Sequence, residues 1–508
     1  MRDGAVEQAA GAAESAHENG AGDDVDGPRP GASRLRDLPG ELRALAGRHR
    51  VFTVILVMGA LLRATAMLGY PPIMYFNDSF DYLHVANDPY PHPLRPDGYS
   101  FLLVILRPFH SFVLVAAVQH LMGLAMGLMV YATLRRRMGL PGWGAALAAA
   151  PVLLDAYQIQ LEQLVLSDTL FAFLVVSAAT LLLWHDRPGW RVALAVGLLL
   201  AAAWLTRTLG LPVLVGVLVF MVVRRTGWRA VAVVLVAAAV PTAAYMTWFS
   251  QTHGKFAMTA GDGVFLFARA YKFADCHKIP NLTVDETLLC VQPGHKLPYS
   301  QDGIWNRRSP LKRVTDLRFG PRQNEIAGGF SRKAIKAQPG DYLKVVALDF
   351  ARTFRWDRPV FPDEKTYRMY EFDRTELPLA SWDMGDGTRA GDAALRYEAG
   401  PARTRVVEPF AGIVRGYQSL AHLPGVLLGG LLLVGLAGMV RMWRRFGGAA
   451  FLPWSLATGL LLAPAATVEF DYRYVLPAVP LACLAAGIAV GQYALSRRNR
   501  STSARSSL

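Results

Sequence analysis

The sequence predicts an α-helical polytopic membrane protein with about ten transmembrane helices and a large extracytoplasmic loop domain. Its 508 residues are 53% hydrophobic and only 18% charged, whereas a soluble globular chain carries roughly 25% charged residues. The apolar residues gather into runs of roughly 17 to 23, the length that a helix needs to cross a hydrocarbon layer of roughly 30 Å. Arginine-rich connections alternate with arginine-poor ones between these runs. These three observations exclude an ordinary soluble domain.

The chain begins with a polar segment, residues 1–48, that is rich in Gly, Ala, Asp and Glu before it turns basic. Nothing in it could form a packed core, so we expect a disordered cytoplasmic tail. It is not a cleaved signal, because the first apolar run begins too late in the chain. The predicted spans are residues 51–69, 111–133, 143–157, 164–184, 190–206, 209–223, 229–249, 423–440, 449–467 and 474–494.

The basic residues of the short connections predict how these spans are oriented. With the N-terminus inside, every cytoplasmic connection is rich in arginine, as the positive-inside rule requires. The short outer connections hold single basic residues, Arg207 and Arg473. We therefore expect a multi-pass protein of the cell membrane with both termini in the cytoplasm. Topology also accounts for most of the net charge of +14, so nucleic-acid binding is not needed to explain it.

Two polar regions on the predicted outer side are long, and the second is long enough to form a domain. Within it, apolar positions at helical spacing between Phe330 and Phe354, interrupted by Pro339, predict helices that lie against the membrane surface. The predicted division of the chain is a tail (1–48), a membrane domain (49–249) with its first loop (70–110), an extracytoplasmic loop domain (250–422), C-terminal spans (423–495) and a cytoplasmic tail (496–508).

Three cysteines are too few for a disulfide scaffold or a zinc site. Cys276 and Cys290 lie fourteen positions apart in the loop domain, whereas Cys483 lies in an apolar run. If the loop domain faces an oxidising compartment, we expect a disulfide between Cys276 and Cys290. Two unrelated free thiols are the alternative.

Ionisable residues at the rim of a membrane cost free energy unless they serve a purpose. Those that topology does not explain all fall on the predicted outer side. Taken singly, each has a structural explanation, such as a turn at Asp97 or a helix start at Asp168. Together they predict one site of mixed charge, in which arginine binds phosphate and a carboxylate accepts a proton. The candidates are Asp78, Asp81, Arg95, Tyr99, Glu162, Asp168, Arg207, Arg473 and Tyr474.

Five short motifs resemble those of the GT-C glycosyltransferases, integral-membrane enzymes that include protein O-mannosyltransferases and the aminoarabinose transferases of lipid A. The resemblance covers roughly residues 50–250 and 420–495 and leaves the loop domain unmatched. The motifs are Asn77-Asp78-Ser79-Phe80-Asp81-Tyr82, Arg95-Pro96-Asp97-Gly98-Tyr99, Leu166-Ser167-Asp168-Thr169-Leu170, Leu205-Thr206-Arg207-Thr208-Leu209-Gly210 and Arg473-Tyr474-Val475-Leu476-Pro477.

The resemblance implies a role for several of these residues. Asp78 matches the catalytic base and Asp168 the second acidic residue, while Arg207 and Arg473 would hold the carrier phosphate. Many relatives have an acidic pair, Asp-Glu, where this chain has Asp78 followed by Ser, and Asp81 is therefore a rival for the base. The remaining candidates for substrate binding are Arg95, Tyr99, Glu162 and Tyr474.

The implied reaction moves a sugar from a polyprenyl-phosphate carrier, itself a membrane lipid, to a hydroxyl of a protein, glycan or lipid. The configuration of the anomeric carbon is inverted. No spacing of acidic residues is specific enough to indicate a divalent metal ion, and whether one takes part stays open. The alternatives are a transporter or flippase of lipid-linked sugars, a cell-envelope glycan polymerase or ligase with lipid-diphosphate donors, and a non-catalytic assembly protein. Arg63, inside the first span, favours transport unless its side chain reaches the outer interface.

Overall fold

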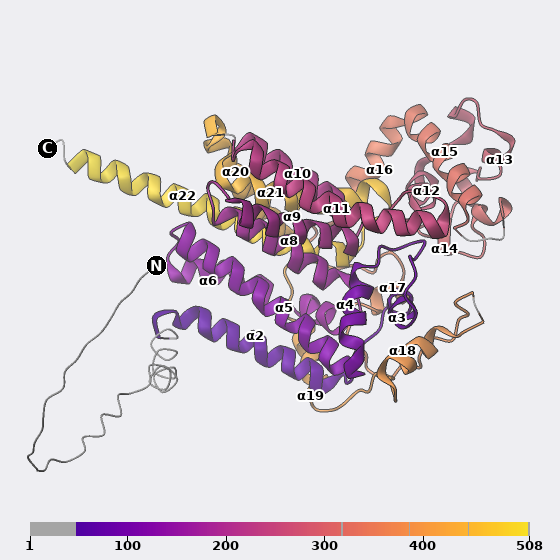
Figure 1. Ribbon diagram of the computed structural model, residues 1–508, viewed down its shortest axis with the longest axis horizontal. Coiled ribbons are helices and arrows are strands. Elements are labelled where there is room, and N and C mark those ends of the chain that lie inside the picture. The colour runs from indigo at the N-terminus through magenta and orange to yellow at the C-terminus, as the bar shows by residue number, and fades with distance from the viewer. Residues whose placement is uncertain (1–46, 316–318, 386, 446, 506–508) are drawn as a thin grey trace, which may run out of the picture. The chain divides into compact units, whose positions relative to one another are not determined.

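Apolar helices dominate the computed structural model, which describes residues 47–315, 319–385, 387–445 and 447–505 (Figure 1). A helix lies at each of the ten predicted spans, which confirms the helical fold. Five helical segments are long and apolar enough to cross a membrane, and six apolar helices are shorter, so the number of crossings stays a prediction. The helices at the predicted spans are α2 (Arg50–Gly69), α5 (Phe112–Ala132), α6 (Gly142–Leu154), α8 (Ser167–Leu183), α9 (Trp190–Thr206), α10 (Gly210–Val223), α11 (Trp228–His253), α20 (Gly425–Arg441), α21 (Phe451–Thr467) and α22 (Val479–Arg505).

The structure describes little of the predicted N-terminal tail but most of the predicted C-terminal one. Nearly all of the N-terminal tail, residues 1–46, lies outside them, as do residues 506–508 at the other end. The last helix, α22, continues beyond the predicted span as far as Arg505.

Two segments of the first loop are tied to the membrane helices, and both ties position the site. Met74 donates its N–H to the Gln163 carbonyl (2.9 Å) and accepts the N–H of Val165 (3.0 Å). The stretch before α3 (Ser79–Asn87) therefore runs beside the stretch before α8. Gly98, the first residue of α4 (Gly98–Leu106), packs so closely on the end of α9 that a Cβ there would lie 2.6 Å from the Leu205 carbonyl carbon.

The sequence predicts one domain over residues 250–422, and the described part of this region contributes to three hydrophobic clusters, the smallest of which includes Met258. Residues between Val264 and Ala334 form a core of their own around Phe267 and Phe330. Residues between Phe361 and Val414 instead join the core of the membrane helices. Asn87 of α3, for example, donates to the Ala393 carbonyl of α18 at 2.8 Å. The α-helices of this region are α12 (Asp262–Phe273), α13 (Val284–Thr287), α14 (Asp302–Trp305), α15 (Pro321–Ala337), α16 (Pro339–Arg352), α17 (Glu364–Arg368), α18 (Ala390–Glu398) and α19 (Phe410–Gln418).

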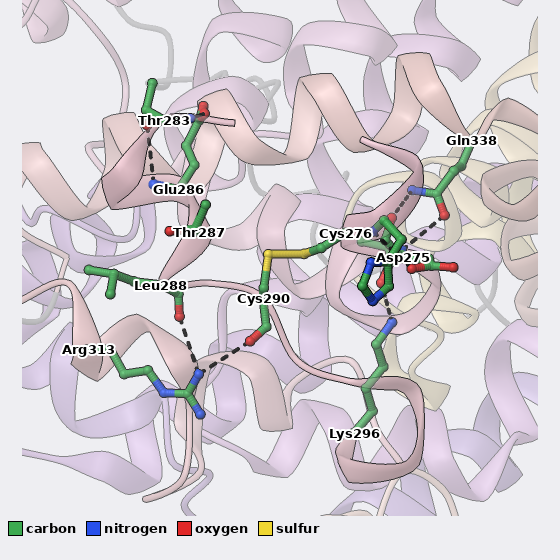
Figure 2. The surroundings of a disulfide bond; sticks show 12 residues. Asp275, Cys276, Thr283, Glu286, Thr287, Leu288, Cys290, Lys296, Arg313 and Gln338 are labelled. Atoms are coloured by element: carbon green, nitrogen blue, oxygen red, sulfur yellow. Dashed lines mark hydrogen bonds between the residues drawn. A yellow bond between two sulfur atoms is a disulfide. The ribbon is translucent and has the colours of Figure 1, made fainter. Parts of the chain in front are cut away.

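Two details predicted for the loop region are present in the structure. Cys276 and Cys290 form a disulfide with Cα atoms 5.9 Å apart. Arg313 donates to the Cys290 carbonyl at 3.3 Å beside it (Figure 2). The expected helix break at Pro339 is also found, because α15 ends at Ala337 and α16 begins with the proline. A proline at the first helical position fits, since that residue has no helical acceptor for an N–H.

Candidate functional site

Asp78 precedes α3, and arginines donate to both of its carboxylate oxygens. Arg95 Nη2 lies 2.8 Å from Oδ1, and Arg473 Nη1 lies 2.8 Å from Oδ2. The residue is only 8% exposed. Charge-assisted bonds of this kind are roughly twice as strong as neutral ones, so they fix the carboxylate between the first loop and the segment before α22.

Arg95 also binds the rival candidate, Asp81. Its Nε donates to Asp81 Oδ2 at 2.8 Å, and one guanidinium thus bridges two carboxylates three positions apart on the first turn of α3. The Asp81 side chain is 23% exposed, compared with 11% for Asp78. His92 Nε2 lies 4.0 Å from the other Asp81 oxygen. Asp81 therefore lies at the outer edge of the cluster, and Asp78 lies inside it.

Ser79 follows Asp78, at the position that the resemblance to GT-C enzymes matches to a second acidic residue. Its Oγ accepts the N–H of Phe76 at 2.8 Å and donates to the Val165 carbonyl at 2.7 Å. The side chain is fully buried. This hydroxyl therefore holds the first loop against the segment that leads into α8.

Asp168, in the first turn of α8, forms an ion pair with Arg207 at the end of α9. Arg207 Nη1 lies 2.5 Å from Asp168 Oδ1, and the carboxylate is 1% exposed. Neither oxygen of Asp168 has a hydrogen-bond donor of suitable geometry among the described residues. The pair is thus held by charge, and its carboxylate has lone pairs available for a hydroxyl.

Tyr474 connects the two arginines that the resemblance assigns to the phosphate. The Arg207 guanidinium carbon lies 5.2 Å from the centre of its ring, and that of Arg473 lies 5.1 Å away. Arg473 also lies 4.8 Å from the ring centre of Phe76. Contacts between guanidinium groups and aromatic faces are attractive. The aromatic rings thus keep two positive charges close together.

The electrostatics of the cluster keep Asp78 ionised. Burial raises the pKa of Asp78, but Arg95 and Arg473 lower it more, and the result is about 2. A carboxylate with so low a pKa is a weak base until one of the arginines moves away. Any base catalysis by Asp78 therefore requires a substrate that draws an arginine from it.

Two contacts of the site involve tyrosines, of which Tyr82 lies in the first motif and Tyr370 was not predicted from the sequence. Tyr82 and Ser167 hydroxyl oxygens lie 2.9 Å apart, which links α3 to α8. Tyr370 donates to Asp471 at 2.7 Å, beside Arg473. The motif containing Tyr82 indicated its neighbourhood, but no pattern marks Tyr370, which comes from the loop region.

Tyr99 and Glu162 form no hydrogen bond or ion pair with the charged cluster among the described residues, although the Tyr99 ring packs edge-on against Tyr82 with 5.1 Å between ring centres. The hydroxyl of Tyr99 donates to Gln119 at 2.9 Å in the helix core. Glu162, in α7 (Ala156–Gln163), is fully buried and accepts from Arg63 at 2.7 and 2.9 Å and from His120 at 2.9 Å. This forms a second buried polar cluster next to the first. Asp78, Asp81, Arg95, Asp168, Arg207, Arg473 and Tyr474 are the predicted residues that the structure brings together.

Arg63 does not reach the outer interface, and that interpretation of its position was wrong. It is 2% exposed and, besides Glu162, donates to the carbonyls of Gly59 at 3.0 Å and Leu153 at 2.7 Å. The Glu162 countercharge and the two carbonyl acceptors offset part of the cost of burying this guanidinium. The partner lies 99 positions away, so the sequence did not reveal it.

No group of three or more His, Cys, Asp or Glu residues with metal-site geometry occurs among the residues that the structure describes. In the candidate site, arginines occupy the positions around Asp78 and Asp81 at which a cation would bind.

No protein-family model matches the chain, and no curated protein matches it significantly. Solved structures do match. The protein O-mannosyltransferase Pmt1-Pmt2 of S. cerevisiae, bound to its sugar donor, has a TM-score of 0.34 and 17% identity over 44% of this chain and 36% of its own. The oligosaccharyltransferase AglB of Archaeoglobus fulgidus has a TM-score of 0.37 and 14% identity over 90% of this chain and 52% of its own.

A third match is ArnT from Cupriavidus metallidurans bound to undecaprenyl phosphate, with a TM-score of 0.34 and 12% identity over 87% of this chain and 78% of its own. The chain is similar to these proteins. It spans about a third of the mannosyltransferase chain and about half of the oligosaccharyltransferase.

Proposed function

We propose that this protein is a membrane glycosyltransferase that moves a sugar from a polyprenyl-phosphate carrier to a hydroxyl acceptor on the extracytoplasmic side, with inversion. The observation that carries the proposal is the meeting of Asp78, Asp168, Arg207 and Arg473 from four separate parts of the chain. Paired arginines bind a phosphate, and a carboxylate beside them accepts a proton. The motifs shared with GT-C enzymes support the same reaction.

The reaction needs a base and a phosphate clamp. The acceptor oxygen attacks the anomeric carbon from the face opposite the phosphate, while its proton passes to Asp78. The bond between the anomeric carbon and the phosphate oxygen breaks, and the electron pair leaves with the lipid phosphate. Arg207 and Arg473 offset the charge that grows on this leaving group.

Donor binding also prepares Asp78 for its role. Arg473 is bound to Asp78 Oδ2 before the donor arrives. The phosphodiester of the donor carries one negative charge, like a carboxylate, and gains a second as the sugar leaves; its oxygens match the guanidinium fork and compete with Asp78 for Arg473. When Arg473 turns toward the phosphate, Oδ2 becomes available to the acceptor hydroxyl, and the pKa of Asp78 rises because a stabilising charge has moved away.

Asp78 is a better candidate for the base than Asp81. Asp78 shares Arg473 with the proposed phosphate site, whereas Asp81 contacts only Arg95 and lies near His92. Asp81 then acts as a positioning residue, because it holds Arg95 in the orientation that reaches Asp78.

The test is sugar transfer by membranes that contain Asp78→Asn or Asp81→Asn. Polyprenyl-phosphate mannose, glucose and arabinose carrying a radiolabel are supplied, and the label that leaves the lipid is counted. We expect Asp78→Asn to reduce transfer by about 100-fold or more, as the loss of a general base does, and Asp81→Asn to reduce it less.

Asp88→Asn is the matched control, because Asp88 follows α3 and forms an exposed ion pair with Arg396. It should transfer at the wild-type rate. Transfer by Asp78→Asn at the wild-type rate, in protein that is expressed and inserted, would disprove the base assignment.

The same membranes distinguish transfer from transport. A flippase leaves the label on the carrier and changes only the leaflet that contains it. If the label stays on the carrier lipid for all three sugars but moves to the other leaflet, the transporter is favoured. The same assay is repeated with sugars on lipid-diphosphate carriers. Transfer from these donors alone would favour a glycan polymerase or ligase.

A further inference from the structure

A second basic pocket lies apart from the Asp78 cluster. Its cavity has a volume of about 40 Å³. Arg352, Arg355 and Arg358, three positions apart from one another, line it together with two tyrosines. Its lining contains none of Asp78, Asp168 or Arg207. The function proposed above therefore does not use these arginines.

Arg358 is held in place without a hydrogen-bond acceptor. Its guanidinium carbon lies 3.5 Å from the ring centre of Tyr157 and 4.0 Å from that of Tyr472. Its Nε is buried and has no hydrogen-bond partner within the described part of the chain. A buried donor without an acceptor is destabilising. The rings thus orient a guanidinium whose Nε donor has no acceptor among the described residues.

The carboxylates of the pocket do not supply that acceptor. Asp155 accepts the backbone N–H groups of Tyr157, Gln158 and Leu423 at 2.7 to 3.2 Å. Asp357 is bound to Arg355 through two hydrogen bonds of 2.9 and 2.8 Å. The lining contains three arginines and these two aspartates. Arg352 Nε donates to Asp349 at 3.3 Å. Of the three arginines, Arg358 is therefore the one without a hydrogen-bonded carboxylate among the described residues, and an anion is its complementary ligand.

The pocket lies at the ends of apolar helices. Gly425, the first residue of α20, packs so closely on the arginine segment that a Cβ there would collide with the carbonyl oxygens of Thr353 and Arg355. Leu154 at the end of α6 accepts the Tyr417 hydroxyl nearby. Trp356 lines the pocket and is 67% exposed. Tryptophan at the end of a membrane helix is typical of the headgroup level of a bilayer.

We propose that this pocket binds the phosphate of an anionic phospholipid headgroup from the surrounding membrane. The ring-clamped Arg358 and its neighbour Arg352 donate to the phosphate oxygens, and the acyl chains lie along α20. The small cavity accommodates a phosphate but not a glycan. The site is distinct from the donor site and does not depend on the proposed transferase activity.

The test is thermal unfolding of the full-length protein in phosphatidylcholine nanodiscs with increasing phosphatidylglycerol. A ligand that binds the folded state raises the unfolding temperature as its concentration grows. We expect the wild type to be stabilised, and Arg358→Gln to need about tenfold more phosphatidylglycerol for the same rise, because a charge-assisted contact is lost. Arg352→Gln should act in the same direction.

Two controls distinguish this pocket from other basic surfaces. Arg396→Gln removes an exposed arginine that pairs with Asp88, and Arg224→Gln removes one from a predicted cytoplasmic connection. Both should respond to phosphatidylglycerol like the wild type. The proposal would be overturned if phosphatidylglycerol raised the unfolding temperature of Arg358→Gln and Arg352→Gln as much as that of the wild type. It would also be overturned if the two control variants lost the response to the same extent as Arg358→Gln.

Inorganic phosphate supplies the last arm. Because the lipid is anchored at the depth of the pocket, millimolar phosphate in phosphatidylcholine nanodiscs should produce no comparable rise. An equal rise with inorganic phosphate that Arg358→Gln abolishes would assign the pocket to a free anion and overturn the lipid assignment. Arg358→Lys keeps the charge but not the planar donor group, so its expected response lies between wild type and Arg358→Gln.

Discussion

At the scale of single residues, the candidate site is a set of paired opposite charges. Asp78, Asp81 and Asp168 form ion pairs of 2.5 to 2.8 Å with Arg95, Arg207 and Arg473, and Asp471 lies 3.7 Å from Arg473. In a site shielded from water, such pairs hold one another in fixed positions. A bound phosphate would add negative charge to this set, and the arginines must then be shared. This sharing is the physical basis of the activation proposed for Asp78.

The titration of Glu469 gives a residue-scale prediction. Burial raises its pKa from 4.5 to about 7, although it accepts the backbone N–H groups of Ser300 and Gln301. Because the folded state holds the proton more tightly, this stability is fully present below about pH 4.5 and is lost as pH rises through about 7, at most about 3 kcal/mol.

Glu469→Gln removes this titration. Relative to the variant, the wild type should therefore lose stability between about pH 5 and about pH 8. Thermal unfolding of both proteins in the same detergent at the two pH values measures the difference. Parallel changes in the two proteins would show that Glu469 does not titrate in this range.

The sequence predicted much of the charged cluster, and the reason is positional. Asp78, Asp168, Arg207 and Arg473 each lie next to the end of an apolar run, so the fold itself brings them to one side. Glu162 has the same position but turns into the helix core to meet Arg63. The sequence indicates how deep in the membrane such a residue lies. The direction of its side chain depends on partners that are distant in the chain.

At the scale of elements, α7 is fixed by the buried carboxylate of Glu162. Besides Arg63 and His120, Gln158 donates to it at 3.0 Å. Glu162→Gln leaves Arg63 without a countercharge, and the loss of one partner of a buried pair costs about 3–5 kcal/mol. We expect a corresponding fall in the unfolding temperature in detergent.

A double variant provides the control for this prediction. Arg63→Met with Glu162→Met removes both charges and should recover most of the stability, because apolar side chains of similar size can replace a buried pair. Wild-type stability of Glu162→Gln alone would show that the pair contributes nothing.

The elements themselves were predicted with different success. The ten apolar runs became helices because their length and composition leave little alternative in a membrane. The break at Pro339 followed from the missing N–H of proline. The division of residues 250–422 was not predicted, since contacts such as that between Tyr397 and the Leu103 carbonyl join residues 294 positions apart.

At the scale of the whole molecule, the proposed reaction depends on orientation. The Cys276–Cys290 disulfide provides a natural probe, because the only other cysteine, Cys483, is buried. In intact cells, a membrane-impermeant reductant followed by an impermeant maleimide should label the loop region. Without the reductant we expect little labelling.

The variant with Cys276→Ser and Cys290→Ser is the control and should remain unlabelled. Labelling of the wild type only after the cells are opened would place the loop region in the cytoplasm. It would then contradict the extracytoplasmic site and, with it, the need for a lipid-linked donor.

Ser79 restricts which side chains its position can accept. Its hydroxyl fits between the Phe76 N–H and the Val165 carbonyl, three positions before Asp168. A glutamate there would place a longer, negatively charged side chain against a carbonyl oxygen and push away the segment that carries Asp168. We therefore expect Ser79→Glu to destabilise the fold unless residues around Val165 change with it.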